Sequence, residues 1–279
     1  MIPPVPAVFL KADASPIRRL AVRPADTLGR VFVPEYHNIS RGRGPMYRTP
    51  SQLAFDLERM WRLGFRPVTM REYAEGRMRL PRGASPVAIT FDDSSGTQLR
   101  LRRDGTVDPQ CAVGVMMAFA RRHPDFPARA TFYVLPRFFD QPQFRAQKLR
   151  ILLELGCEIG SHTLTHPDLA KCSDGRVKRE LAGAIEFLTR LGVPGPYSFA
   201  APYGLYPRHR SLVAGFTYKG RRYTHANAAF AYYGAGRSPF DHRFDRFRID
   251  RIVACPGREG LDDYLDRARR GRIRLYVAK

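Results

Sequence analysis

Short apolar runs alternate with longer amphipathic stretches along most of the chain. The runs "AITF", "ATFYV" and "CEIGS" read as buried strands, and the stretches between them repeat their apolar residues with a helical period. Repeated strand and helix units with short connections predict a parallel sheet, either open or closed into a barrel. The pattern therefore places the chain in the α/β class.

One helix is predicted with both of its ends. Thr49 is suited to the N-cap, Pro50 to the first helical position, and Gln52 completes a capping box. Gly64 stands where the helix should stop. Its apolar residues recur on one face, which is the spacing of a core-facing helix.

The same pattern divides the chain. Residues 1–30 are punctuated by proline and lack periodicity, so we expect an irregular N-terminal arm. Residues 31–279 contain no repeat and no convincing linker, and we expect them to form a single domain. Within that domain, residues 94–110 form a polar, glycine-containing loop insertion directly after two adjacent aspartates. Long loops in such positions are usually functional or mobile.

Charge adds a second property. The 279 residues include 47 Lys and Arg against 26 Asp and Glu, a formal net charge of +21. Such a charge attracts polyanions in a salt-sensitive, largely sequence-blind way, so an anionic polymer or wall surface is a candidate partner. The basic residues are spread along the chain without an aromatic-interleaved motif. We therefore expect a basic, solvated surface and no specific nucleic acid partner.

Few signals point to a compartment. No apolar run is long enough to span a bilayer, so we expect no transmembrane segment. The N-terminal apolar stretch is short and broken by Pro3, Pro4 and Pro6, which makes a poor secretory signal. From this chain alone the expected location is cytoplasmic. The four cysteines lie far apart and indicate neither a disulfide scaffold nor a zinc knuckle.

Candidate chemistry begins with Asp92 and Asp93, which adjoin each other at the end of a predicted strand. Neighbouring side chains on a strand point to opposite faces. Both carboxylates can therefore serve one site only if the strand ends there and the backbone turns.

A second stretch holds His162 and His166, four residues apart after another predicted strand. They would share one face if the backbone turned helically. With a carboxylate from a different strand end they would form a three-ligand metal set with open positions, the catalytic type of site. A second carboxylate that does not bind the metal could then accept a proton from water. The alternative is a pair of ordinary polar residues that cap a helix.

The third stretch is "FAAPYG", in which Tyr203 follows a proline. Proline has no amide hydrogen, so the amide of Tyr203 is the first free donor and could stabilise an oxyanion. The same letters are also common in turns. All three stretches follow predicted strands, and the carboxyl ends of parallel barrel strands gather on one face.

In this order, "TFDD", "SHTLTH" and "FAAPYG" resemble the first three motifs of the polysaccharide deacetylases, carbohydrate esterase family four. The family's early Tyr-His pattern is matched by "VPEYHNI", which contains His37. The resemblance runs from about residue 31 to about residue 255. It implies a distorted (β/α) barrel of seven or eight strands and metal-dependent removal of acetyl groups from an N-acetylated glycan, a polysaccharide or peptidoglycan.

The resemblance also implies residue roles. Asp92 would be the general base, and Asp93, His162 and His166 would bind a divalent metal, zinc with cobalt or nickel as alternatives. Tyr203 would contribute its backbone amide to the oxyanion site.

Several positions depart from the family pattern. Ala200 stands where an arginine usually orients the base, Ser94 replaces a frequent glycine, and the only tryptophan, Trp61, cannot complete the fourth motif. The late Leu-x-His that supplies the general acid is absent. His225 is the candidate replacement, with a surface histidine as the alternative. These departures leave two other functions open: a non-catalytic barrel that binds a polyanion or glycan, and a hydrolase of a small N-acyl amide.

Overall fold

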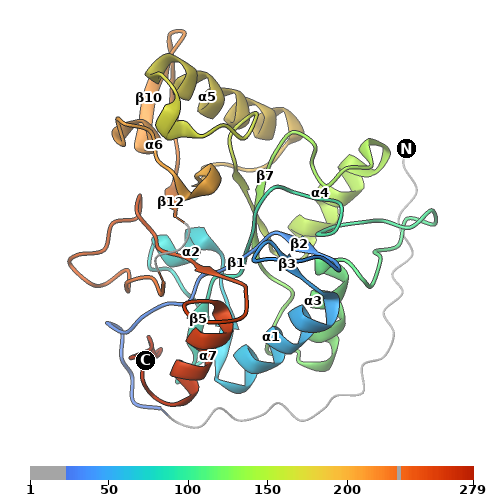
Figure 1. Cartoon of the computed structure of the whole chain (residues 1–279), viewed down its shortest axis with the longest axis vertical. Coiled ribbons are helices and arrows are strands. Elements are labelled where there is room, and N and C mark those ends of the chain that lie inside the picture. Colours follow the sequence, from blue (N-terminus) through green and yellow to red (C-terminus); the bar gives the residue numbers. More distant parts are fainter. Residues whose placement is uncertain (1–22, 231–233) are drawn as a thin grey trace.

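The computed structural model describes residues 23–230 and 234–279, so the N-terminal arm predicted for residues 1–30 falls largely outside the described residues. At the centre is a seven-stranded parallel sheet in the order β12-β9-β8-β7-β6-β1-β13 (Figure 1). Its strands are β1 (Pro34–Tyr36), β6 (Thr90–Phe91), β7 (Thr131–Val134), β8 (Glu158–Ser161), β9 (Ser198–Ala200), β12 (Asn227–Ala229) and β13 (Ile252–Val253).

One segment links the two edges of this sheet. Ile249 lies in a parallel bridge with Ala229 at the end of β12. A few residues later, Ile252 donates its amide to Val33 (2.9 Å) as β13 joins β1. The sheet is thereby curled toward a barrel, and the predicted distorted (β/α) barrel is confirmed.

Helices follow most of the strands. They are α1 (Pro50–Arg62), α2 (Met70–Ala74), α3 (Ala112–Arg122), α4 (Arg145–Glu154), α5 (Asp174–Leu191), α6 (Ser211–Ala214) and α7 (Leu261–Arg269), with the 3-10 turns η1 (Pro142–Phe144), η2 (Leu169–Lys171) and η3 (Pro202–Gly204). Helix α1 begins as predicted, because Thr49 accepts the Gln52 amide and the Gln52 side chain accepts the Thr49 amide. At its other end Gly64 has φ 81°, a conformation that glycine adopts without strain.

Two-stranded pairs complete the described elements, and one predicted strand is missing. The pairs are β2 (Asn38–Ile39) with β3 (Tyr47–Arg48), β4 (Phe65–Pro67) with β5 (Ser85–Val87), and β10 (Gly215–Tyr218) with β11 (Arg221–Thr224). The sequence of the C-terminal run "IRLYVA" predicts a closing strand, but the run makes only isolated bridges at Leu275 and Val277, so that prediction is wrong. None of the helices in the described ranges is long and apolar enough to cross a membrane.

Buried side chains form two groups that reflect the curled sheet. The larger group includes Leu53 and Leu57 of α1 together with Phe91 and Phe132 of the sheet, so it fills the layer between sheet and helices. A smaller group contains residues such as Val33, Tyr133, Ala200 and Ile249. Along β7, Phe132 belongs to the first group and Tyr133 to the second, as the alternation of side chains on a strand requires.

Candidate active site

The backbone leaves its extended conformation immediately after β6. Asp93 has φ 73° and Ser94 has φ 48°, both left-handed. Strand β6 ends at Phe91 and the backbone turns at Asp93, as the sequence requires if both aspartates are to serve one site. Ser94 is buried and its hydroxyl accepts the amide of Leu135 (3.1 Å), which ties the turn to the end of the neighbouring strand β7.

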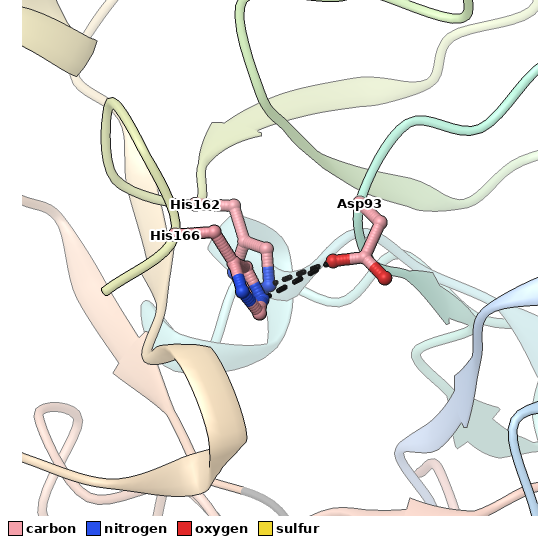
Figure 2. Close-up of side chains that lie close together, drawn as sticks. All are labelled: Asp93, His162 and His166. Carbon is pink, nitrogen blue, oxygen red and sulfur yellow. Dashed lines mark ion pairs between the residues drawn. The ribbon is translucent and has the colours of Figure 1, made fainter. Parts of the chain in front are cut away.

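Asp93, His162 and His166 come together beyond the ends of β6 and β8 (Figure 2). The Asp93 Oδ1 atom lies 3.4 Å from His162 Nε2 and 3.3 Å from His166 Nε2. Ligands bound tetrahedrally to zinc at about 2.0–2.1 Å lie roughly 3.3 Å from one another. The two distances from Asp93 Oδ1 fit a single small cation, and all three ligand atoms lie within 4.8 Å of one another.

The surroundings of the three side chains favour a cation as well. Asp93 Oδ1 is buried and has no hydrogen-bond partner, although buried carboxylate oxygens normally have one. His162 Nδ1 lies 2.9 Å from the carbonyl of Ala200, so a proton on Nδ1 leaves Nε2 as the free ligand atom. Burial lowers the pKa of His162, but the attraction of Asp92 and Asp93 outweighs it and raises the pKa above its ordinary value. The same negative potential attracts a metal ion.

The turn that carries the two histidines is not the helical one expected from their spacing. Thr163 and His166 have left-handed backbones, with φ 68° and 59°. Glu180 of α5 is buried and holds the turn by accepting from the amide and the hydroxyl of Thr165 (2.8 Å each). The two imidazoles therefore meet because of an irregular turn anchored on α5.

Asp92 has a partner that the sequence did not reveal. Arg251, which precedes β13, makes two 2.8 Å hydrogen bonds to the two carboxylate oxygens of Asp92. Both side chains are buried, and the Arg251 Nε atom also donates to the carbonyl of Phe230 (2.8 Å). Arg251 thus holds the predicted base in the way expected of the arginine that Ala200 replaces.

A second carboxylate shares the same guanidinium. Glu35 of β1 lies 3.3 Å from Arg251 Nε and is buried. Burial raises the pKa of Asp92, but the attraction of Arg251 and His162 outweighs it and holds the pKa well below its usual range. Burial raises the pKa of Glu35 above its ordinary value, with Arg251 opposing it. Of the two acids, Asp92 is therefore the one kept ionised.

His37 lies on the other side of Asp92 from the metal-ligand candidates, since β1 and β8 flank β6 and β7 in the sheet. Its Nε2 atom is 3.6 Å from Glu35, and single ligand atoms of Glu35, His37 and Asp92 lie within 4.8 Å of one another. The ring is 11% exposed, and its Nδ1 atom is buried without a hydrogen-bond partner. His37 is therefore placed to exchange a proton next to Asp92.

Tyr203 lies beside the metal-ligand candidate His166. Its backbone is left-handed (φ 58°) within η3, directly after β9. The residue is 60% exposed, and its ring meets the His166 ring edge-on at 4.8 Å between centroids. Asp93, Thr163, His166 and Tyr203 thus all hold a conformation that costs about 1–3 kcal/mol for a residue other than glycine, and such strain concentrates at functional sites.

The structure does not bring His225 to these residues. It precedes β12, its Nδ1 atom lies 2.9 Å from the carbonyl of Val213, and its ring packs on Phe199 at 5.0 Å. Phe199 belongs to the layer between sheet and helices, whereas Ala200 belongs to the inner group. His225 is buried, and no contact recorded among the described residues links it to Asp92 or Asp93.

Burial lowers the pKa of His225 to about 4. An unfolded chain would bind a proton at this residue near pH 6.5. The stability contributed by neutral His225 is therefore complete above about pH 6.5 and is lost as the pH falls toward 4, by on the order of 3 kcal/mol. We expect denaturant unfolding at pH 7 and pH 4.5 to show a smaller loss of stability in His225→Phe than in the wild type. Equal losses in both proteins would contradict this placement.

Comparison with protein families gives a match to the polysaccharide deacetylase model over residues 79–216, about half of the chain. The match contains Asp92, Asp93, His162, His166 and Tyr203. Arg251 and the Glu35–His37 pair lie outside it.

Sequence relatives include chitooligosaccharide deacetylases. That of a Bradyrhizobium species is 30% identical over 124 residues, 43% of this chain and 52% of that protein. That of Rhizobium leguminosarum bv. phaseoli is 30% identical over 118 residues, 41% of this chain and 48% of that protein. The chain thus spans about half the length of these relatives.

Solved structures share the fold at low sequence identity. The Streptococcus pyogenes deacetylase PplD, determined in complex with acetate, aligns with a TM-score of 0.62 at 16% identity over 86% of this chain and 98% of that one. IcaB from Ammonifex degensii aligns with a TM-score of 0.57 at 17% identity over 86% and 97%. The family match over residues 79–216 and the sequence relatives identify the chain as a member of the polysaccharide deacetylase family, and the solved structures share its fold.

Proposed function

We propose that the protein is a metal-dependent deacetylase that removes N-acetyl groups from the amino-sugar units of a polysaccharide or peptidoglycan. The observation that carries the proposal is the difference between two adjacent carboxylates. Asp93 faces two imidazole nitrogens with an unpartnered oxygen, and Asp92 is fixed by Arg251. One acid is thereby suited to a cation and the other to a proton.

A divalent ion held by Asp93, His162 and His166 would polarise the acetyl carbonyl and make water more acidic. Asp92, kept ionised by Arg251, would accept the proton that the attacking water loses. The backbone amide of Tyr203 would donate to the oxyanion as the carbonyl carbon becomes tetrahedral.

The amine leaves with a proton, and His37 is the histidine best placed to supply it. Of the seven histidines, His123, His209 and His242 interact with acids elsewhere on the surface, and His225 contacts Val213. With His162 and His166 proposed as metal ligands, His37 is the remaining histidine, and it has a partly exposed ring, a neighbouring carboxylate in Glu35 and proximity to Asp92. We therefore assign the general-acid role to His37 in place of His225.

A non-catalytic binding barrel is now less well supported. One reason for it was the missing arginine, because a base without a positive partner is poorly held in a buried site. The two hydrogen bonds from Arg251 to Asp92 remove that reason.

Acetate release from chitooligosaccharides tests the proposal. We expect the purified protein to release acetate when loaded with zinc, cobalt or nickel, and to stop after treatment with a chelator. His162→Ala should lose both stoichiometric metal and activity, whereas His242→Ala, which changes a side chain that is 88% exposed, should keep both. A chelator-treated protein that still hydrolyses the substrate at the full rate would overturn the metal dependence.

A further inference from the structure

The insertion of residues 94–110 is fastened to the strand ends that carry the site. The hydroxyl of Thr97 accepts the amide of Ile39 (3.0 Å), and the Gln98 side chain donates to the carbonyl of His37 (2.8 Å). The Gln98 side chain also donates to the carbonyl of Asp92. The base of the insertion therefore lies directly against the segment that holds the proposed acid and base.

The rest of the insertion is ordered by contacts with the loop after β7. Leu101 and Val107 form an antiparallel bridge within the insertion. The Gln141 side chain accepts from the amide of Leu101 (3.0 Å) and donates to its carbonyl (2.8 Å). The Asp140 carboxylate accepts the amide of Gly96 (2.9 Å). The insertion thus has a fixed shape beside the site.

The loop after β7 is itself held in an unusual conformation. Residues 138–141 all have left-handed backbones, with φ between 41° and 60°. The buried Lys148 of α4 donates to the carbonyls of Phe139 (2.6 Å) and Asp140 (3.1 Å). The left-handed backbone of four residues and the burial of an ammonium group both cost free energy, which is a large expense for holding a surface loop. The rigidity of the insertion therefore calls for a function.

Charge indicates which function. Arg102 and Arg103 are exposed in the insertion, and Arg41 and Arg43 are exposed in residues 40–46, next to the bond between Ile39 and Thr97. None of these four arginines forms an ion pair within the described ranges. The two acids of the insertion are already engaged, since Asp108 pairs with Arg100 (2.8 Å) and Asp104 accepts from the amide and hydroxyl of Thr106. We call residues 40–46 and 94–110 the basic loop pair.

We propose that the basic loop pair binds anionic groups of the glycan substrate, carboxylates or phosphates carried by the sugars next to the one that is deacetylated. The inference rests on the proposed function. The basic loop pair follows β1 and β6, so it lies at the same edge of the sheet as Asp92 and His37. A chain held there by its charges would place a neighbouring N-acetylated sugar at the reacting residues.

Other anionic partners fit the surface less well. The insertion contains no aromatic residue on which a nucleic acid base could stack. Its apolar residues are turned inward, with Leu101 buried and Val107 half-buried, so none is offered to a bilayer. An anionic glycan needs neither contact.

The test compares acetate release by the full chain from three N-acetylglucosamine-containing oligosaccharides of equal length. One is neutral, one alternates with a uronate, and one is linked by phosphodiesters. We expect kcat/KM for one or both anionic substrates to exceed that for the neutral one at low salt and to fall with added salt. The better anionic substrate identifies carboxylate or phosphate as the group recognised.

A variant with Arg41, Arg43, Arg102 and Arg103 each replaced by glutamine should lower kcat/KM for the preferred anionic substrate roughly tenfold or more, and for the neutral substrate much less. The control replaces four exposed arginines of α3 and the segment after α7 with glutamine, namely Arg121, Arg122, Arg270 and Arg272. It removes the same charge and should keep the preference.

Equilibrium binding of the same anionic oligosaccharides without acetyl groups separates this inference from the proposed function, because it needs no catalysis. Tighter binding by the wild type than by the four-glutamine variant at the loops supports the inference even if no acetate is released. Equal losses on neutral and anionic substrates, or equal effects of the control variant, would overturn it. Preferential binding of DNA or of anionic phospholipid vesicles over the anionic glycans would also overturn it.

Discussion

Replacing Arg251 by alanine is expected to lower the free energy of unfolding by about 3–5 kcal/mol, because the change leaves two buried acids without their positive partner. Asp92 and Glu35 both face this guanidinium and both are buried. Activity should fall as well, since Asp92 loses the two hydrogen bonds that orient it. Denaturant unfolding and acetate release measure the two effects.

The control for Arg251→Ala is Arg272→Ala, which changes an exposed arginine after α7 and should leave stability within about 0.5 kcal/mol of the wild type. Two further measurements separate positioning from folding. Added guanidinium should restore part of the activity of Arg251→Ala. A triple variant with Glu35→Gln, Asp92→Asn and Arg251→Met, which leaves no unpaired charge, should be more stable than Arg251→Ala. If Arg251→Ala lost less than about 1 kcal/mol of its free energy of unfolding, the two acids would not depend on Arg251 for their neutralisation.

Asp92→Asn is expected to reduce kcat by about 10² to 10⁴ while the protein keeps its metal. Asparagine keeps one acceptor oxygen for Arg251, because its NH2 group can only donate, and it cannot take a proton from water. The proposed ligands Asp93, His162 and His166 are unchanged, so metal content should equal that of the wild type. Steady-state kinetics and metal analysis on the same preparation provide both values.

The matched variant is Asp93→Asn, one residue away, which should lower metal content along with activity. This contrast tests the division of work between the adjacent carboxylates. If Asp92→Asn lost its metal, or if it turned over substrate at the wild-type rate, the assignment of Asp92 as the base would be wrong.

Local chemistry explains what the sequence could predict. The N-cap at Thr49 and the glycine stop at Gly64 depend only on neighbouring residues, and the structure has them at the two ends of α1. The adjacent aspartates and the spaced histidines follow strands β6 and β8, so the parallel sheet alone brings them to one edge. The meeting of Asp93 with His162 and His166 could therefore be anticipated from short motifs.

The contacts that hold Asp92 depend on segments that lie far apart in the sequence. Glu35, Asp92 and Arg251 are separated by long stretches of sequence and are joined only because the segment before β13 links both edges of the sheet. A signal did exist, since Arg251 directly precedes the apolar strand-like run "IVAC" and a buried arginine needs an acid. His225 is predicted to reach the site but does not. A shift of one residue along a strand moves a side chain to the other face, and the sequence alone does not fix that position.

The place of Arg251 also bears on how the protein is made. The residues proposed to hold the metal are all present once the ribosome has passed His166, but Glu35 and Asp92 have no counter-charge until residue 251 emerges. Domains synthesised at about 5–20 residues per second can begin to fold before they are complete. Nascent chains that stop short of Arg251 would lack the guanidinium that faces both acids, so the assembled barrel should form late and as a unit. Truncated products would then be exposed to proteolysis instead of persisting as partly active fragments.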